Sequence, residues 1–191
     1  ETDKLFVQKM AQKTNNQIII TNQFGGALGF KSKDQYDAVS DGAVIIANTY
    51  PGHLVGIEPM FLYPSLPFLA EPIENARILW DIALPDMEKI LERDGSKLLY
   101  AAPWPPSGIW TKKKIHSTTD LENLKIRCAD KAGIQTFKKM GAAPIQLSWG
   151  DIIPQLSTGG LDAVLTSCDG GVASKFYEHM NYFHEMNYSF P

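Results

Sequence analysis

Cysteine is scarce in this sequence of 191 residues, which contains only Cys128 and Cys168. No C-x-x-C spacing is present, so the sequence supports neither a zinc cluster nor a thioredoxin-type redox site. The spacing of the two cysteines does not imply a disulfide between them. Because a free thiol packs as a small hydrophobic group, we expect both side chains to be buried.

Clustered positive charge and long apolar runs are also lacking. The net charge is −3, and the one cationic run, residues 112–114, is short. Binding to a phosphate backbone needs a broader basic surface, so nucleic acid is not an expected partner. The longest apolar stretches fall far below the roughly 20 residues that span a bilayer, so we expect no membrane anchor among these residues.

Common catalytic and metal-binding signatures are absent as well. The sequence contains no G-x-S-x-G, G-x-x-x-x-G-K-[ST] or H-E-x-x-H motif and no intact G-x-G-x-x-G. The four histidines lie in separate regions, and the two nearest in the chain, His179 and His184, do not fall on one helical face. We therefore expect no metal site, no cofactor and no enzymatic activity.

Periodic apolar residues and helix breakers predict the secondary structure of the first half. The expected helices cover residues 2–13, 32–42 and 72–94, and the expected strands cover residues 18–20, 43–47 and 97–102. Ser32 is the expected N-cap of the second helix, and a proline-rich loop spans residues 48–71. The continuous apolar run at 43–47 is typical of a parallel strand that is covered on both faces.

Strands and helices alternate again in the second half. The expected strands cover residues 125–128, 144–147 and 161–165, the expected helices cover 132–140 and 148–158, and residues 174–185 predict a short helix and an edge element. This alternation predicts an α/β fold with mainly parallel sheets. The unusual loop at 103–108 divides the chain into an incomplete first lobe, 1–103, and a second lobe, 104–191.

The two halves contain similar segments. "QYDAVSDGAVIIANT" and "IIPQLSTGGLDAVLTSCDGG" both run from a helix through glycine and an apolar run to a polar loop. Ligands bind beyond the carboxyl ends of strands in open α/β sheets, so two such lobes are expected to enclose a ligand cleft. The alternative is that any two βαβ units share this order of elements.

Arg127 is the strongest candidate binding residue. It stands at the end of an expected strand, from which a planar guanidinium can grip a carboxylate through two parallel hydrogen bonds. The alternative is an ordinary salt bridge or a solvated charge.

Aromatic and polar residues gather in the loops expected around the cleft. Indole and phenol rings offer flat faces to a ring or an apolar ligand body, and hydroxyl and amide groups offer hydrogen bonds. Core packing and ordinary wet loops are the alternatives. The candidates are Tyr50, Trp104 and Trp149, together with Asn48, Thr49, Thr166 and Ser167.

Residues 117–182 carry a series of ordered motifs that resemble a known family. S-x-x-D-L-x-x-x-K-x-R is followed by G-A-x-P, a helix ending in L-x-T-G, D-A and K-F-Y-E; "GGALG", "DGAVIIA" and "YPSLPFLAE" lie upstream. These motifs are similar to those of the DctP-type receptors of TRAP transporters. The resemblance spans nearly the whole chain.

The resemblance implies a periplasmic-binding-protein-like, two-lobed receptor that captures an organic acid and delivers it to TRAP membrane permease subunits. It implies a periplasmic location and a signal peptide in the precursor. In this family the arginine of K-x-R, here Arg127, pairs with the ligand carboxylate. The family's cleft residues after the D-A strand fall on Thr166 and Ser167, where many members have asparagine.

Departures from the family pattern narrow the expected ligand. Many members have a second arginine before the S-x-x-D-L motif, whereas this sequence has none between Arg93 and Arg127. An unpaired second carboxylate would cost several kcal/mol of desolvation, so we expect a monocarboxylate with a ring or an apolar body. Glu1 is not an initiator, and the family's first strand and C-terminal return are missing, so we expect an incomplete receptor.

Two other functions remain compatible with the residues alone. One is an α/β enzyme with Cys128 or Cys168 as nucleophile, although no histidine is placed by sequence to act as its base. The other is the effector-binding domain of a regulator, which shares the two-lobed design.

Overall fold

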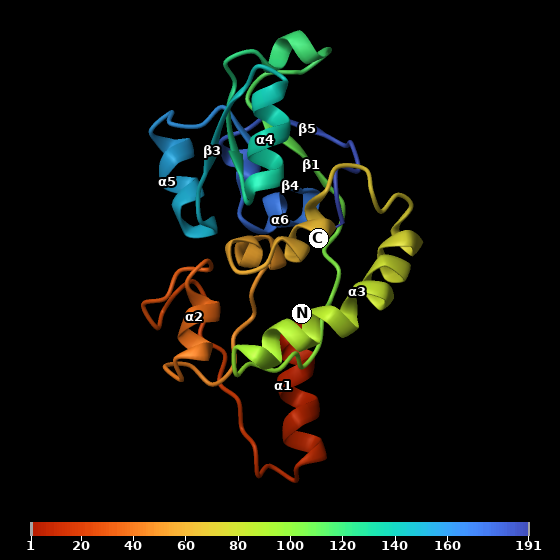
Figure 1. Cartoon of the computed structure of the whole chain (residues 1–191). Helices are drawn as coiled ribbons and strands as arrows, with labels where there is room; N and C mark the ends of the chain where they lie inside the picture. Colours follow the sequence, from red (N-terminus) through yellow and green to blue (C-terminus); the bar gives the residue numbers. More distant parts are fainter. Residues whose placement is uncertain (1, 191) are drawn as a thin grey trace. The chain divides into compact units, whose positions relative to one another are not determined.

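The computed structural model describes residues 2–190, and the chain divides into two compact units, residues 1–31 and 32–191 (Figure 1). The described part of the first unit contains the helix α1, Thr2–Lys13, which confirms the predicted helix. The hydroxyl of Thr14 donates to the Met10 carbonyl and accepts from the backbone N–H of Ile18, so it closes the helix. Residues 18–20 form no strand.

Helices form the first part of the second unit. These are α2 (Gln35–Ser40), the 3-10 helices η1 (Pro51–Gly56) and η2 (Pro59–Ser65), and α3 (Ile73–Arg93). Asp34 rather than Ser32 is the N-cap of α2, so the predicted cap is wrong. Tyr36 and Leu54 pack with Phe61, Met87 and Leu91 into one buried cluster, which joins α2 and the 3-10 helices to α3.

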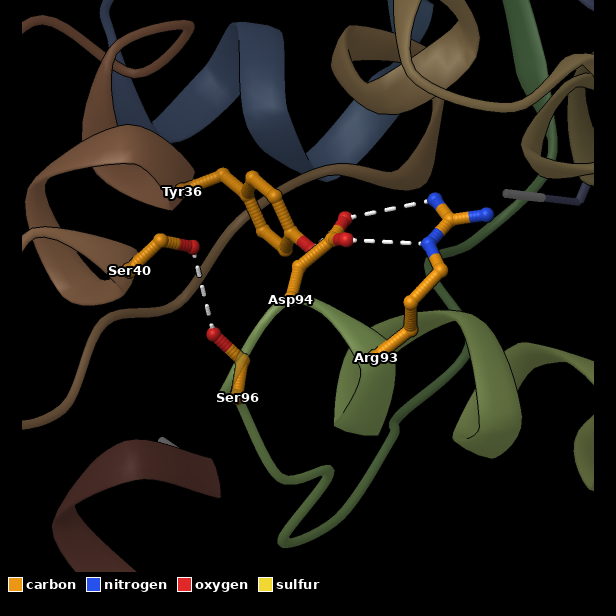
Figure 2. Close-up of polar contacts among 5 residues, drawn as sticks. All are labelled: Tyr36, Ser40, Arg93, Asp94 and Ser96. Carbon is orange, nitrogen blue, oxygen red and sulfur yellow. Dashed lines mark hydrogen bonds and ion pairs between the residues drawn. The ribbon is translucent and has the colours of Figure 1, made fainter.

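Polar side chains connect α2 to the end of α3. The Tyr36 hydroxyl donates to the Asp94 carboxylate at 3.0 Å, and Arg93 Nε pairs with the same carboxylate at 3.0 Å (Figure 2). The hydroxyls of Ser40 and Ser96 lie 3.4 Å apart. Asp94 therefore serves as a common acceptor for side chains from both helices.

The strands expected at 43–47 and 97–102 are wrong, because neither segment forms a strand among the described residues. A strand exists only when a neighbouring strand satisfies its backbone N–H and C=O groups. Ile45 is 91% exposed, and Leu99 is also exposed. The apolar runs identified segments able to form strands. They did not show whether a neighbouring strand is present to pair with them.

One five-stranded sheet organises the second part of the unit, in the order β3-β2-β4-β1-β5 (Figure 1). Its strands are β1 (Ser107–Thr111), β2 (Lys125–Cys128), β3 (Ala143–Gln146), β4 (Ala163–Ser167) and β5 (Tyr182–His184). β2 pairs with β3 and β4 in parallel, whereas β1 pairs with β4 and β5 antiparallel. The α/β class is confirmed, and the sheet is mixed.

Helices complete this part of the unit. They are η3 (Thr118–Leu121), α4 (Lys131–Lys139), η4 (Trp149–Asp151), α5 (Ile152–Ser157), α6 (Cys168–Ala173) and η5 (Phe176–Glu178). The three strands and two helices expected after residue 124 are confirmed to within a few residues. The edge element expected within residues 174–185 is β5. β1 was not predicted, and its first two residues were expected to belong to the loop at 103–108.

Two apolar clusters cover the two faces of the sheet. Ile126 and Cys128 of β2 face Phe137 of α4, while Val164 of β4 faces Ile152 of α5. Successive side chains of a strand point to opposite faces. Arg127, between Ile126 and Cys128, therefore lies on the face that α5 covers.

Candidate functional site

The candidate site begins at the carboxyl ends of the parallel strands β2, β3 and β4. Arg127 is the next-to-last residue of β2 and pairs in register with Ile145 of β3 and Val164 of β4. Trp149 follows β3, and Thr166 is the next-to-last residue of β4. Parallel strands end at one edge of a sheet, so the polar loops that follow them converge there.

The Arg127 side chain is buried, with 4% of its surface exposed. Its Nε donates to the Leu147 carbonyl at 3.0 Å, which fixes the plane of the guanidinium. The Trp149 ring covers this group, with the guanidinium carbon 5.6 Å from the ring centroid. The structure thus brings two of the predicted site residues into direct contact.

Burial changes the acid–base properties of Arg127. Desolvation lowers the pKa of its guanidinium to about 10, although the nearby Cys128, Tyr50 and Asp130 oppose that shift. The side chain is therefore still protonated at neutral pH. Within residues 2–190, the ion pairs of the structure do not include Arg127. Arg127 is thus a buried cation without a carboxylate partner of its own in this part of the chain.

Tyr50 joins a buried polar cluster beside Arg127. Its hydroxyl donates to Asp130 Oδ2 and also contacts the hydroxyl of Ser65, and all three side chains are buried. Burial and the Asp130 carboxylate raise the pKa of Tyr50 well above its usual value. The sequence reasoning missed Asp130 and Ser65. An aspartate directly before a helix is a recognisable N-cap signal, but its contact with Tyr50 spans 80 residues of chain.

Two further rings pack on Tyr50. The Trp104 ring stacks on it with centroids 5.5 Å apart, and the His53 ring meets it edge-on at 5.2 Å. Desolvation lowers the pKa of His53, and the nearby Arg127 lowers it further. His53 is therefore neutral at pH 7. His53 was given no role at the site from the sequence, so its position beside Tyr50 was not predicted.

The residues at the end of β4 lie beside Trp149. A Cβ at Gly170 would lie in ordinary contact with the Trp149 ring, at 3.4 Å, and with the Thr166 hydroxyl, at 3.5 Å, so both side chains lie next to Gly170. The Ser167 hydroxyl accepts from the Gly170 N–H at 3.3 Å and caps α6. Thr166 is thus placed at the site, while Ser167 has a local capping role.

The segment before Tyr50 contributes the remaining predicted residues. The Thr49 hydroxyl and His53 Nδ1 are buried without a hydrogen-bond partner among the described residues. Such groups cost free energy unless something pairs with them. Asn48 is exposed and precedes Tyr50 by two residues.

The cysteines differ from each other. Cys128 is fully buried, which raises the pKa of its thiol to about 12, so that it stays protonated and unreactive. Cys168 is exposed, so the prediction that both are buried is wrong. Cys168 is the first residue of α6, where its side chain is exposed.

Two grooves lie away from Arg127. One, of about 390 Å³, is lined mainly by apolar residues of η2 and α3, with Asp86 at α3. The other, of about 230 Å³, lies between β1, η3 and α4 and includes His116 and His184. No helix within residues 2–190 is both long and apolar enough to cross a membrane.

Comparison with known proteins gives consistent matches along the chain. The family described as "Bacterial extracellular solute-binding protein, family 7" matches residues 1–190. A protein of Chromohalobacter salexigens named "Solute-binding protein" is 25% identical over 186 residues, which cover 93% of this chain and 54% of that protein.

Solved structures of receptors also match nearly the whole chain. DctP7, a Bordetella pertussis extracytoplasmic solute receptor binding pyroglutamic acid, superimposes with a TM-score of 0.95 at 28% identity. A marine metagenome TRAP solute binding protein specific for pyroglutamate gives 0.93 at 28% identity. Each alignment covers 99% of this chain and 62% of the other. This chain spans from about half to two thirds of the length of these relatives.

Proposed function

Because this chain belongs to family 7 of the bacterial extracellular solute-binding proteins, we propose that it captures an organic carboxylate at Arg127 and delivers it to the membrane subunits of a TRAP transporter. The observation that carries this proposal is the buried guanidinium of Arg127, which takes part in no ion pair within residues 2–190. We propose that the protein acts in the periplasm, as the periplasmic relatives from Halomonas elongata and Ruegeria pomeroyi do.

The electrostatics of Arg127 favour an anionic ligand. Burial disfavours the charged guanidinium and lowers its pKa to about 10. A ligand carboxylate would offset this cost by accepting two charge-assisted hydrogen bonds from the terminal nitrogens, since Nε already donates to Leu147. The expected binding geometry is therefore bidentate through the two terminal nitrogens.

The aromatic residues favour a ligand with a ring or an apolar body. Trp149 covers the guanidinium, and Trp104 stacks on Tyr50 with an exposed face. Flat indole faces provide apolar contact area around a bound carboxylate and strengthen its pairing by excluding water. We propose that Trp149 lies over the ligand as well as over Arg127.

The polar groups favour a single carboxylate with one further polar substituent. Residues 102–110, which run into β1, read "APWPPSGIW" and provide no second arginine. The unpartnered Thr49 hydroxyl and His53 Nδ1 are uncharged groups that a neutral ligand substituent could satisfy. Cyclic monocarboxylates such as pyroglutamate, which two related receptors bind, combine these features and are the first candidates.

The proposal is tested in two steps. A thermal-shift screen of pyroglutamate, aromatic acids, keto acids, sugar acids and dicarboxylates identifies binders, because a ligand of the folded state raises the melting temperature. Calorimetry then compares the wild type with Arg127→Ala, which we expect to bind at least about tenfold more weakly. Arg127→Lys keeps the charge without the bidentate geometry and should fall between them.

Arg93→Ala is the matched control. Arg93 is an exposed arginine that pairs with Asp94 at the end of α3, so its removal changes the net charge by the same amount. We expect its carboxylate affinity to stay within about twofold of the wild type, since screening weakens distant exposed charges. If Arg127→Ala binds as tightly as Arg93→Ala, the proposal is wrong.

A further inference from the structure

Asp130 is a carboxylate that could compete with a ligand for Arg127. It lies three residues after Arg127, is 5% exposed, and is close enough to influence the guanidinium electrostatically. An internal carboxylate beside a cation acts at a high effective concentration, because it pays no entropy of association. The site can therefore bind an external carboxylate tightly only if Asp130 is held elsewhere.

Each oxygen of Asp130 already accepts a hydrogen bond in the structure. Oδ1 accepts from the Gly133 N–H at 2.9 Å, which makes Asp130 the N-cap of α4. Oδ2 accepts from the Tyr50 hydroxyl. A phenol has one proton, so the Ser65 hydroxyl must be the donor in its contact with Tyr50. Tyr50 thus connects Asp130 to Ser65 in one directed chain of hydrogen bonds.

The Tyr50 ring has little freedom to release Asp130. Trp104 stacks on one face at 5.5 Å with an interplanar angle of 10°, and His53 packs against the ring edge-on. A Cβ at Gly52 would lie 2.5 Å from the Tyr50 ring and 3.0 Å from Asp130 Cβ, so no larger residue fits there without displacement. Three neighbours therefore fix the direction of the phenol hydroxyl.

We propose that Tyr50 is a positioning residue, which holds the Asp130 carboxylate away from Arg127 and so keeps the guanidinium free for an external carboxylate. This inference rests on the proposed function and changes the role predicted for Tyr50. Its hydroxyl already donates to Asp130, so it has no proton left to donate to a ligand. Tyr50 acts through Asp130, not by contacting the ligand.

The test is a double-mutant cycle measured by calorimetry, with pyroglutamate or the tightest binder of the panel as the probe. Tyr50→Phe frees Oδ2 of Asp130, which then competes for Arg127, so we expect affinity to fall about threefold to tenfold. Asp130→Asn removes the competing charge and keeps an N-cap side chain. Adding Asp130→Asn to Tyr50→Phe should return the affinity to within about twofold of that of Asp130→Asn alone.

Each outcome separates this role from the alternatives. If the Tyr50 hydroxyl bound the ligand directly, its loss would weaken binding equally with and without the Asp130→Asn substitution, and the absence of rescue would overturn the inference. Wild-type affinity in Tyr50→Phe would overturn it as well. Circular dichroism shows whether Tyr50→Phe is folded. If it is unfolded, the comparison of Asp130→Asn with the double variant tests the inference: a weaker affinity in the double variant would overturn it.

The same series separates this inference from the proposed function. If the wild type binds no acid of the panel, or if Arg127→Ala binds as the wild type does, the proposed function fails. If Arg127→Ala loses affinity while Tyr50→Phe keeps it, carboxylate capture stands and the positioning role is wrong.

Discussion

The segments 35–49 and 152–171 share an order of residues but not a structure. In 152–171 the apolar run becomes β4, which lies between β1 and β2 and is buried at Ala163 and Val164. In 35–49 the corresponding run forms no strand, and Ile45 is 91% exposed. The difference lies in the neighbours, because backbone pairing and coverage by helices, rather than the apolar run alone, make a strand.

The largest effect expected from this comparison is on stability. Leu161, just before β4, is fully buried, so Leu161→Ala should lower the free energy of unfolding by about 2–5 kcal/mol. Ile45→Ala removes an exposed side chain and should change it by less than about 0.5 kcal/mol. Urea unfolding of both variants measures the difference. Equal losses would mean that residues 43–47 are packed as firmly as β4.

A smaller effect concerns the aromatic cover of the cation. Trp149→Ala removes the ring over Arg127 and exposes the guanidinium to water, so carboxylate binding should weaken by about 0.5–2 kcal/mol. Trp149→Phe keeps a ring and should lose less. Calorimetry with the same probe acid measures both variants. An unchanged affinity in Trp149→Ala would show that this ring does not contribute to binding.

The smallest effect concerns the polar contacts between α2 and α3. Tyr36→Phe removes the hydrogen bond to Asp94, and we expect a loss of about 0.5–1.5 kcal/mol of stability without a change in carboxylate affinity (Figure 2). Arg77→Ala, which breaks an exposed ion pair with Asp81, is the control and should cost less. A loss of ligand affinity in Tyr36→Phe would link this region to the site.

The pH dependence of that stability loss follows from the pKa of Tyr36. Burial and the contact with Asp94 raise the pKa of its phenol from 10 to about 12. The unfolded phenol ionises first, so the contribution to stability is complete below pH 10 and disappears as the pH rises through 12. The difference between wild type and Tyr36→Phe should shrink over that range.

The elements of the second half of the chain were predicted well, because helices and strands that follow one another in the sequence there also pack against one another. β2 was predicted at its observed residues, and Arg127 was predicted as the cation at its end. The pairing of β1 with β4 was not predictable, because Gly108 and three prolines make its segment look like a loop. Propensity describes local preference, whereas pairing depends on distant residues.

The positions of some candidate residues could be predicted for the same physical reason. Arg127, Trp149 and Thr166 lie at or just after the ends of strands that share one sheet edge, and their binding role stays a prediction. The contact of Asp130 with Tyr50 was missed because the two residues are 80 positions apart in the chain. Side chains that meet only through tertiary packing leave no local pattern in a sequence.

The measurement that tests carboxylate capture most directly is a crystal structure with a bound monocarboxylate from the panel. We predict that its carboxylate accepts hydrogen bonds from both terminal nitrogens of Arg127, while Asp130 keeps its contact with Tyr50. A ligand bound elsewhere, with the Arg127 guanidinium paired to Asp130 or turned to solvent, would contradict the account.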